Sequence, residues 1–164
     1  MKFIKAIIKH PVEFIGIVLF SILTITIFFQ VVSRYIFRSP FPWPEELARL
    51  MFVWLSLLGA AIGLKHSSHY KIDYFINFFP KKIKAILEIL IDIFLLFLVI
   101  YWGWIGNKTL NTASNQLYAA LRISMVWLYL AIPVSCSLMF LFLLIRIYHK
   151  IKNLLQFYKK NIKE

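Results

Sequence analysis

Hydrophobic residues gather in four long runs along the chain, at residues 13–33, 46–64, 83–105 and 125–148. The runs hold few charged residues and show almost no amphipathic period, unlike the surface helices of a soluble protein. Crossing the hydrocarbon of a bilayer as a helix takes about 20 mostly apolar residues. The pattern therefore predicts an all-α membrane protein with four transmembrane helices, forming a single four-span domain over residues 1–164.

The residues ahead of the first run are both basic and apolar. Lys2, Lys5 and Lys9 resemble the basic start of a signal peptide, but the run that follows is too long and lacks a small-residue cleavage site. We therefore expect the first span to be retained. The segment itself is predicted to be a short interfacial helix, with its lysines in water and four apolar side chains in the membrane surface, namely Phe3, Ile4, Ile7 and Ile8.

Composition supports the membrane assignment. Hydrophobic residues make up 61% of the chain and mean hydropathy is +0.76, whereas soluble domains average about 45–50% apolar residues. The net charge of +12 could indicate nucleic-acid binding, but the charges lie between and beyond the apolar runs, without forming a stripe. An anionic membrane surface explains that distribution better, so we expect lipid and no nucleic acid as a partner. A single cysteine, Cys136, excludes an internal disulfide.

The basic residues also predict an orientation, because Lys and Arg accumulate in short cytoplasmic loops. Fourteen of them lie in the N-terminal segment, between the second and third runs or at the start of the third, and at the end of the fourth run or in the tail. The opposite side holds four: Arg34, Arg38, Lys108 and Arg122. Both termini are therefore predicted to be cytoplasmic. Four tryptophans fall at the opposite interface, as an aromatic belt would, namely Trp43, Trp102, Trp104 and Trp127.

Histidines do not suggest a cofactor. Axial ligation of haem needs imidazoles inside the bundle, and all four histidines lie in loops or at the ends of runs. His66, His69 and Asp73 have a spacing that imitates a metal site, but zinc takes three or four convergent ligands. A solvated loop with local hydrogen bonds is the favoured interpretation. We expect neither a metal nor a cofactor.

Two carboxylates lie within the third run. Glu88 and Asp92 follow Lys84 at steps of four residues, which places the three on one face of a helix. Lys84 and Glu88 can pair, and Asp92 needs another partner. One interpretation is a proton or ion relay, as in a small proton-coupled exporter. The favoured one is a polar seam at the cytoplasmic end, packed against another helix or reached by water.

The stretch "FRSPFPWPEELARL" places charges at the edge of the second run. Pro44 suits the first turn of a helix, where no N–H is needed. Glu45 and Glu46 then lie near the positive end of the helix dipole, and Glu45 and Arg49 have the spacing of an ion pair. A well-capped helix start explains these residues. It does not explain the rigid, aromatic loop before them or the nearby Arg34.

Small residues and a proline mark two further positions. Gly59 and Gly63 form a G-x-x-x-G pattern, which lets transmembrane helices approach closely but is common by chance. Pro133 is expected to kink the fourth helix and to free a backbone carbonyl. No phosphate-binding loop, activated nucleophile or mid-membrane binding cluster is evident in the sequence. The chain is therefore predicted to be a scaffold and not an enzyme.

Several segments resemble a known family. "SRYIFRSPFPWPEELARLMFVW", the following "LGAA", "HYKID" and "ALRISMVWLYLAIPV" are similar to the small membrane subunit, or Q subunit, of tripartite ATP-independent periplasmic (TRAP) transporters. Together they cover roughly half the chain. The linked W-x-E-E-x-x-R block carries the most specific similarity, and Pro44 departs from its commoner residue.

The resemblance implies a role in a bacterial inner membrane. A periplasmic binding protein would deliver an organic acid, such as a C4-dicarboxylate or sialic acid, to a large membrane subunit. That subunit would move it with sodium, and the small subunit would brace its static part. By resemblance, structural or partner-interface roles fall on a periplasmic-side motif, a cytoplasmic-loop motif and a helix kink: Arg34, Trp43, Glu45, Glu46 and Arg49; His69 and Asp73; and Pro133. The alternative is an independent, homo-oligomeric ion- or proton-coupled transporter.

Overall fold

The computed structural model describes the backbone of residues 11–38, 41–66 and 81–161, and their side chains except at 66, 81, 82, 84, 85 and 153–161. The helices are α2 (Pro11–Tyr35), α3 (Trp43–His66), α5 (Lys81–Ala113), α6 (Val126–Tyr129) and α7 (Ala131–Asn161). The segment expected to form an interfacial helix, together with His69 and Asp73, lies outside the described residues.

Four segments are long and apolar enough to cross a membrane: Pro11–Tyr35, Trp43–Lys65, Ile86–Ala113 and Val126–Lys152. The predicted all-α fold with four membrane-spanning helices is therefore confirmed. The helices extend beyond the predicted runs. The third helix continues to Ala113, and the fourth continues as α7 to Asn161.

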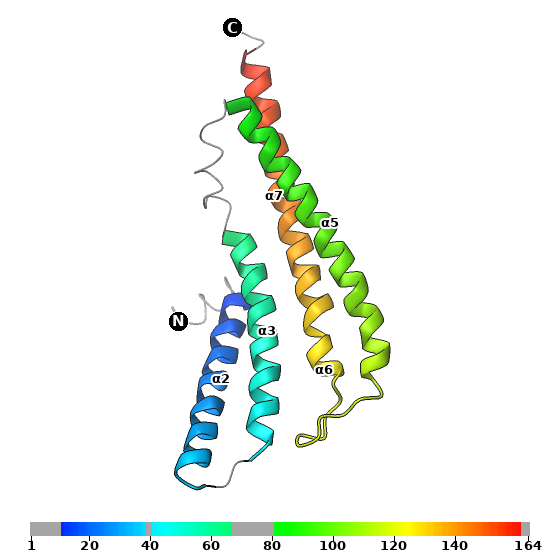
Figure 1. Ribbon diagram of the computed structural model, residues 1–164. Coiled ribbons are helices and arrows are strands. Elements are labelled where there is room, and N and C mark those ends of the chain that lie inside the picture. Colours follow the sequence, from blue (N-terminus) through cyan, green and yellow to red (C-terminus); the bar gives the residue numbers. More distant parts are fainter. Residues whose placement is uncertain (1–10, 39–40, 67–80, 162–164) are drawn as a thin grey trace.

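The helices pack in the spatial order α2, α3, α7, α5. Contacts are extensive between α2 and α3, between α3 and α7, and between α5 and α7. Figure 1 shows α2 beside α3 and α5 beside α7, with the upper parts of α5 and α7 reaching past the other pair. We call the end that carries the turn after α2 and the loop before α6 the loop end. The other end, where α2 begins and α7 ends, is the terminal end.

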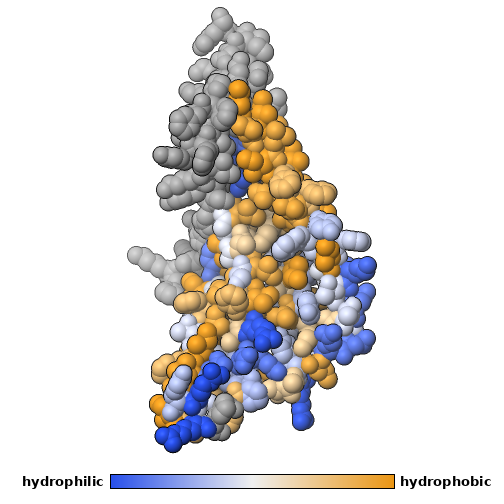
Figure 2. All heavy atoms as spheres, viewed as in Figure 1, coloured by the Kyte–Doolittle hydropathy of each residue, from blue (hydrophilic) through white to orange (hydrophobic). Residues whose placement is uncertain are grey.

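Most of the hydrophobic surface of these helices faces outward. Only 6–22% of the most apolar window of each span is buried inside the chain, and large side chains such as Phe28 and Ile25 are about 70% exposed. Figure 2 shows hydrophobic residues over the middle of the visible face and hydrophilic ones toward the loop end. Such a surface is stable in lipid and not in water.

Glycines allow α5 to approach α7 closely. A Cβ atom on Gly106 would meet Ile132 Cγ2 at 2.6 Å, and one on Gly103 would meet Cys136 Cβ at 3.3 Å. Gly59 and Gly63, the G-x-x-x-G pair of α3, have nothing within 4 Å of such a Cβ. The close helix contact within this chain is therefore made by glycines that the sequence pattern did not single out.

The fourth span is interrupted near its start. α6 ends at Tyr129 and α7 begins at Ala131, so the break falls at Leu130, three residues before Pro133. Proline has no N–H to donate to the carbonyl of Tyr129, four residues earlier. The ladder continues on either side, where Leu130 N–H donates to Val126 and Val134 N–H donates to Leu130. A tryptophan of α3 bridges this region, since Trp54 Nε1 donates to the Trp127 carbonyl at 2.9 Å.

Candidate functional site

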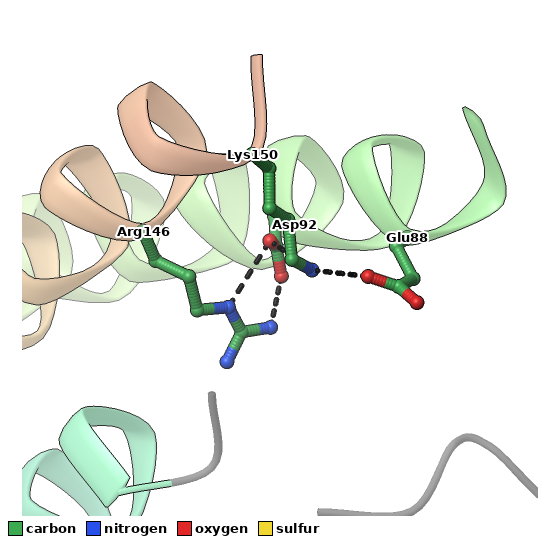
Figure 3. Close-up of polar contacts among 4 residues, drawn as sticks. All are labelled: Glu88, Asp92, Arg146 and Lys150. Carbon is green, nitrogen blue, oxygen red and sulfur yellow. Dashed lines mark hydrogen bonds and ion pairs between the residues drawn. The ribbon is translucent and has the colours of Figure 1, made fainter. Parts of the chain in front are cut away.

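Four charged side chains join α5 to α7 in the terminal half of the bundle (Figure 3). Asp92 Oδ2 accepts a hydrogen bond from Arg146 Nε at 3.0 Å, and Asp92 Oδ1 contacts Arg146 Nη2. Lys150 Nζ lies 2.8 Å from Asp92 Oδ2 and 3.2 Å from Glu88 Oε2. We call these four residues the α5–α7 charge cluster. It contains two acids and two bases, so its formal charges balance.

Burial gives this cluster its energetic weight. The Asp92 side chain has no exposed surface, and that of Arg146 is 12% exposed. A carboxylate taken out of water is costly unless well-placed donors satisfy it. The fork of Arg146 and the ammonium of Lys150 supply such donors, and a two-bond arginine contact fixes geometry as well as charge. The cluster therefore joins α5 and α7 through a buried, charge-assisted contact.

The sequence anticipated only part of this arrangement. Glu88 and Asp92 were expected to share a face, with Lys84 as the partner of Glu88. The Lys84 side chain is not described, and Glu88 contacts Lys150. Arg146 and Lys150 had been counted only as basic residues of the tail. Their four-residue spacing, which matches that of Glu88 and Asp92, was the available signal.

A second ion pair fastens the terminal ends of α2 and α3. Lys65 Nζ lies 2.7 Å from Glu13 Oε1, and both side chains are less than one-third exposed. The same ammonium lies 6.0 Å from the centre of the Phe142 ring, on α7. A cation at that distance from an aromatic face is attracted to it. Lys65 therefore links three helices.

At the loop end, Glu46 holds the loop between α5 and α6. Its Oε1 and Oε2 accept from the Ala120 N–H at 3.0 and 3.1 Å, and Oε2 accepts from the Leu121 N–H at 2.8 Å. These bonds join the first turn of α3 to a loop more than 70 residues later. A carboxylate that accepts backbone N–H bonds makes strong, charge-assisted contacts. We call this contact the Glu46 clamp.

The clamped loop has its own hydrogen bonds. Leu117 and Ser124 form an isolated antiparallel bridge, and Met125 N–H donates to Gln116 at 3.0 Å. Arg122 adopts a φ of 53°, the left-handed region that most side chains avoid. The loop is thus a compact turn whose backbone N–H groups at Ala120 and Leu121 are bound by the Glu46 carboxylate. The W-x-E-E-x-x-R block gave no sign that its second glutamate reached so far along the chain.

The neighbouring pair, Glu45 and Arg49, has a different character. Arg49 Nη2 lies 3.4 Å from Glu45 Oε1, and the side chains are 62% and 61% exposed. An exposed pair of this kind contributes little to stability. Arg34 and Trp43, the other loop-end residues singled out by the sequence, are exposed as well. Pro44 is buried in the first turn of α3.

Tyr118 lies buried within the clamped loop, with 3% of its surface exposed. Its hydroxyl has no hydrogen-bond partner among the described residues. Burial raises the pKa of the phenol above 10.0, while the charge of Arg49 lowers it and that of Glu46 raises it. The phenol therefore stays neutral at physiological pH and packs as a hydrophobic ring.

Within the described residues, the polar groups of the spans mostly satisfy one another. Ser21, Thr24 and Thr26 each donate to the carbonyl four residues earlier in α2, at 2.8–2.9 Å. Ser137 does the same to Pro133 at 2.7 Å. No group of three or more His, Cys, Asp or Glu side chains that could hold a metal ion occurs in the described ranges. In the described ranges, the charged side chains of the spans mainly link helices to one another.

These features first define a class: a multi-pass, all-α membrane protein whose charged residues join its own helices. Its sequence then gives the family. Residues 23–153 match the family model described as "Tripartite ATP-independent periplasmic transporters, DctQ component", and the chain belongs to that family. It is a transporter component of a bacterial inner membrane, and such small subunits work with a large permease subunit.

Relatives agree with this assignment. The chain is 30% identical over 156 residues to the sialic acid TRAP transporter small permease protein SiaQ of Vibrio cholerae, covering 95% of this chain and 88% of the relative. It is 32% identical over 127 residues to the sialic acid TRAP transporter permease protein SiaT of Haemophilus influenzae, covering 77% of this chain. It spans only 21% of SiaT, which is a much longer protein. The C4-dicarboxylate TRAP transporter small permease protein DctQ of Vibrio cholerae is 31% identical over 74 residues, 45% of this chain and 32% of that protein.

Proposed function

We propose that this chain braces the large permease subunit of a TRAP transporter during sodium-coupled uptake of an organic acid, and that substrate does not pass through it. The observation that carries the proposal is the use of the charged residues in the spans. Asp92, Arg146 and Lys150 are joined in the α5–α7 charge cluster, and Glu13 pairs with Lys65. Side chains that are fixed in this way hold helices in place and are poorly suited to binding and releasing a solute.

The proposed substrate is a small organic acid that carries a carboxylate. Relatives named for sialic acid and for C4-dicarboxylates support this class. The residues that select among such acids are proposed to lie in the other components. A periplasmic binding protein would supply the acid, and membrane lipid would surround the outward-facing apolar surface.

The proposed orientation places both termini in the cytoplasm and the loop end in the periplasm. The bias of Lys and Arg toward the terminal side supports it. In that orientation the Glu46 clamp and the exposed residues Arg34, Trp43, Glu45 and Arg49 would face the periplasm. This surface would be the part of the chain available to the binding protein.

Reconstitution tests the bracing role. Liposomes would carry this chain alone, the large subunit alone or both, with a sodium gradient and the binding protein loaded with radiolabelled sialic acid or a labelled C4-dicarboxylate. We expect uptake only when both membrane subunits are present. Uptake by liposomes that contain this chain alone, lost in the Asp92→Asn variant, would overturn the proposal. It would favour an independent homo-oligomeric transporter.

A further inference from the structure

A polar pocket of about 180 Å³ opens at the loop end, between the last turns of α2 and the start of α3. Gln30, Ser33 and Arg34 line it from α2, where spacings of three and four residues put them on one face. Phe41, Pro42 and Glu45 line it from the segment that leads into α3.

The pocket is lined by one cationic side chain, Arg34, and one anionic side chain, Glu45, and these two described residues do not form an ion pair with each other. The Arg34 guanidinium makes no hydrogen bond or ion pair within the described part of the chain. The Glu45 carboxylate contacts Arg49 through Oε1 at 3.4 Å, in a pair that is mostly exposed and therefore weak. Gln30 adds an amide that can both donate and accept. A ligand with one negative and one positive group could use all three side chains.

Aromatic rings lie beside the pocket, at the end of the first apolar span. The Phe29 ring stacks on Phe41 with centres 6.4 Å apart and lies 5.4 Å from the Trp43 ring. All three side chains are more than one-third exposed. Tryptophan is enriched where the hydrocarbon meets the headgroups, and Trp43 is the member of this cluster that carries that signal. The apolar surface of α2 continues from the cluster toward the membrane centre through exposed Ile25 and Ile22.

We propose that this pocket binds the headgroup of phosphatidylethanolamine. Arg34 and Gln30 bind the phosphate, since guanidinium groups match phosphate oxygens in charge and geometry. Glu45 binds the ammonium. The acyl chains run along Phe29 and the isoleucines of α2. A dicarboxylate or another purely anionic ligand would be repelled by Glu45, so a zwitterion fits better than a transported acid.

The size of the pocket is consistent with this ligand. The volume of about 180 Å³ is that of a small polar group and not that of a whole phospholipid. That space suits a compact phosphoethanolamine group and leaves the glycerol and acyl chains outside, against the aromatic rings.

Native mass spectrometry of the complex with the large subunit tests the proposal. The detergent-solubilised complex would be incubated with equal amounts of phosphatidylethanolamine, phosphatidylglycerol and phosphatidylcholine. The subunits would then be dissociated in the spectrometer, and the lipids retained on this chain would be identified by their masses. We expect phosphatidylethanolamine to be retained about fivefold over phosphatidylglycerol, the upper range for one exposed ion pair. It should also be retained over phosphatidylcholine, because a primary ammonium has N–H groups to donate to Glu45 and a choline group has none. Equal retention of the three lipids by the wild-type chain would overturn the proposal, whatever the variants do.

Variants locate the site. Arg34→Gln should remove most of the bound phospholipid. Arg38→Gln changes an exposed arginine just after α2 that does not line the pocket, and it should not remove the lipid. Glu45→Gln should abolish the preference over phosphatidylglycerol. Arg49→Gln breaks the same ion pair without altering the pocket lining and should keep the preference. Wild-type retention in both Arg34→Gln and Glu45→Gln would show that the lipid binds elsewhere.

Discussion

Asp92 of α5 accepts a hydrogen bond from Arg146 of α7 at 3.0 Å, while no part of the Asp92 side chain is exposed. The two residues are 54 positions apart in the sequence. Their contact is a buried polar link between the two longest helices, α5 and α7.

Asp92→Ala should destabilise the protein by about 3–5 kcal/mol, because it leaves buried positive charge without its partner. Glu88→Gln is the matched control, and its side chain is 29% exposed. That control should cost about 1 kcal/mol or less. Thermal unfolding of the purified complex in detergent, followed by helical circular dichroism, measures both. The double variant Asp92→Leu, Arg146→Leu should regain much of the stability that Asp92→Leu alone loses, because it removes both buried charges. Equal losses of stability in Asp92→Ala and Glu88→Gln would show that the buried Asp92 contact is not the important one.

Glu46→Ala should loosen the loop between α5 and α6, because two backbone N–H groups lose their charged acceptor. Each such bond contributes about 1.5–3 kcal/mol. Hydrogen exchange at Ala120 and Leu121 should accelerate at least tenfold. Glu45→Ala, one residue earlier and directed at Arg49, should leave those amides protected. Fast exchange in the wild-type protein would mean that the clamp does not persist in solution.

Gly106→Ala should weaken the packing of α5 on α7, because the added methyl would lie 2.6 Å from Ile132 Cγ2. Overpacking of this kind costs about 1–3 kcal/mol. Gly63→Ala is the control, since its methyl would meet nothing within 4 Å in this chain. Unfolding in detergent compares the two. An unchanged unfolding midpoint for Gly106→Ala would show that the helices separate easily at that position.

Tyr118 should make stability fall at high pH. Burial raises the pKa of this phenol above 10.0 in the folded protein, so the unfolded chain loses its proton first as the pH rises. Stability is therefore retained below about pH 10 and declines above it. Tyr118→Phe should remove this part of the decline and be at least as stable at pH 8, since it deletes a buried hydroxyl without a partner. Unfolding of both proteins from pH 8 to 11 gives the difference, and parallel curves would contradict the prediction.

The sequence predicted the helices well because long apolar runs leave a chain few alternatives in lipid. It also placed Glu88 and Asp92 on one face from spacing alone. Their partners could not be predicted, because pairing between distant helices depends on which helices are neighbours. Glu46 illustrates the same limit. Its position in a helix start suggested a local role, while its actual bonds reach Ala120 and Leu121.

The glycines show a further limit. G-x-x-x-G drew attention to Gly59 and Gly63, whereas Gly103 and Gly106, three residues apart, make the close approach within this chain. The G-x-x-x-G motif indicates that one face of a helix carries small residues, so that another backbone can approach it closely. Which neighbour meets that face is decided by the packing order of the whole bundle.

The single-file packing order of α2, α3, α7 and α5 bears on how the protein is made. Each outer helix packs against an inner helix that is close to it in the sequence: α2 against α3, and α5 against α7. Synthesis runs from the N-terminus, so the α2–α3 pair is complete before the α5–α7 pair leaves the ribosome. The Glu13–Lys65 bridge forms within the first pair and the α5–α7 charge cluster within the second. Biogenesis can thus proceed as two successive insertions, and each inserted pair already contains both partners of its own interhelix ion pairs.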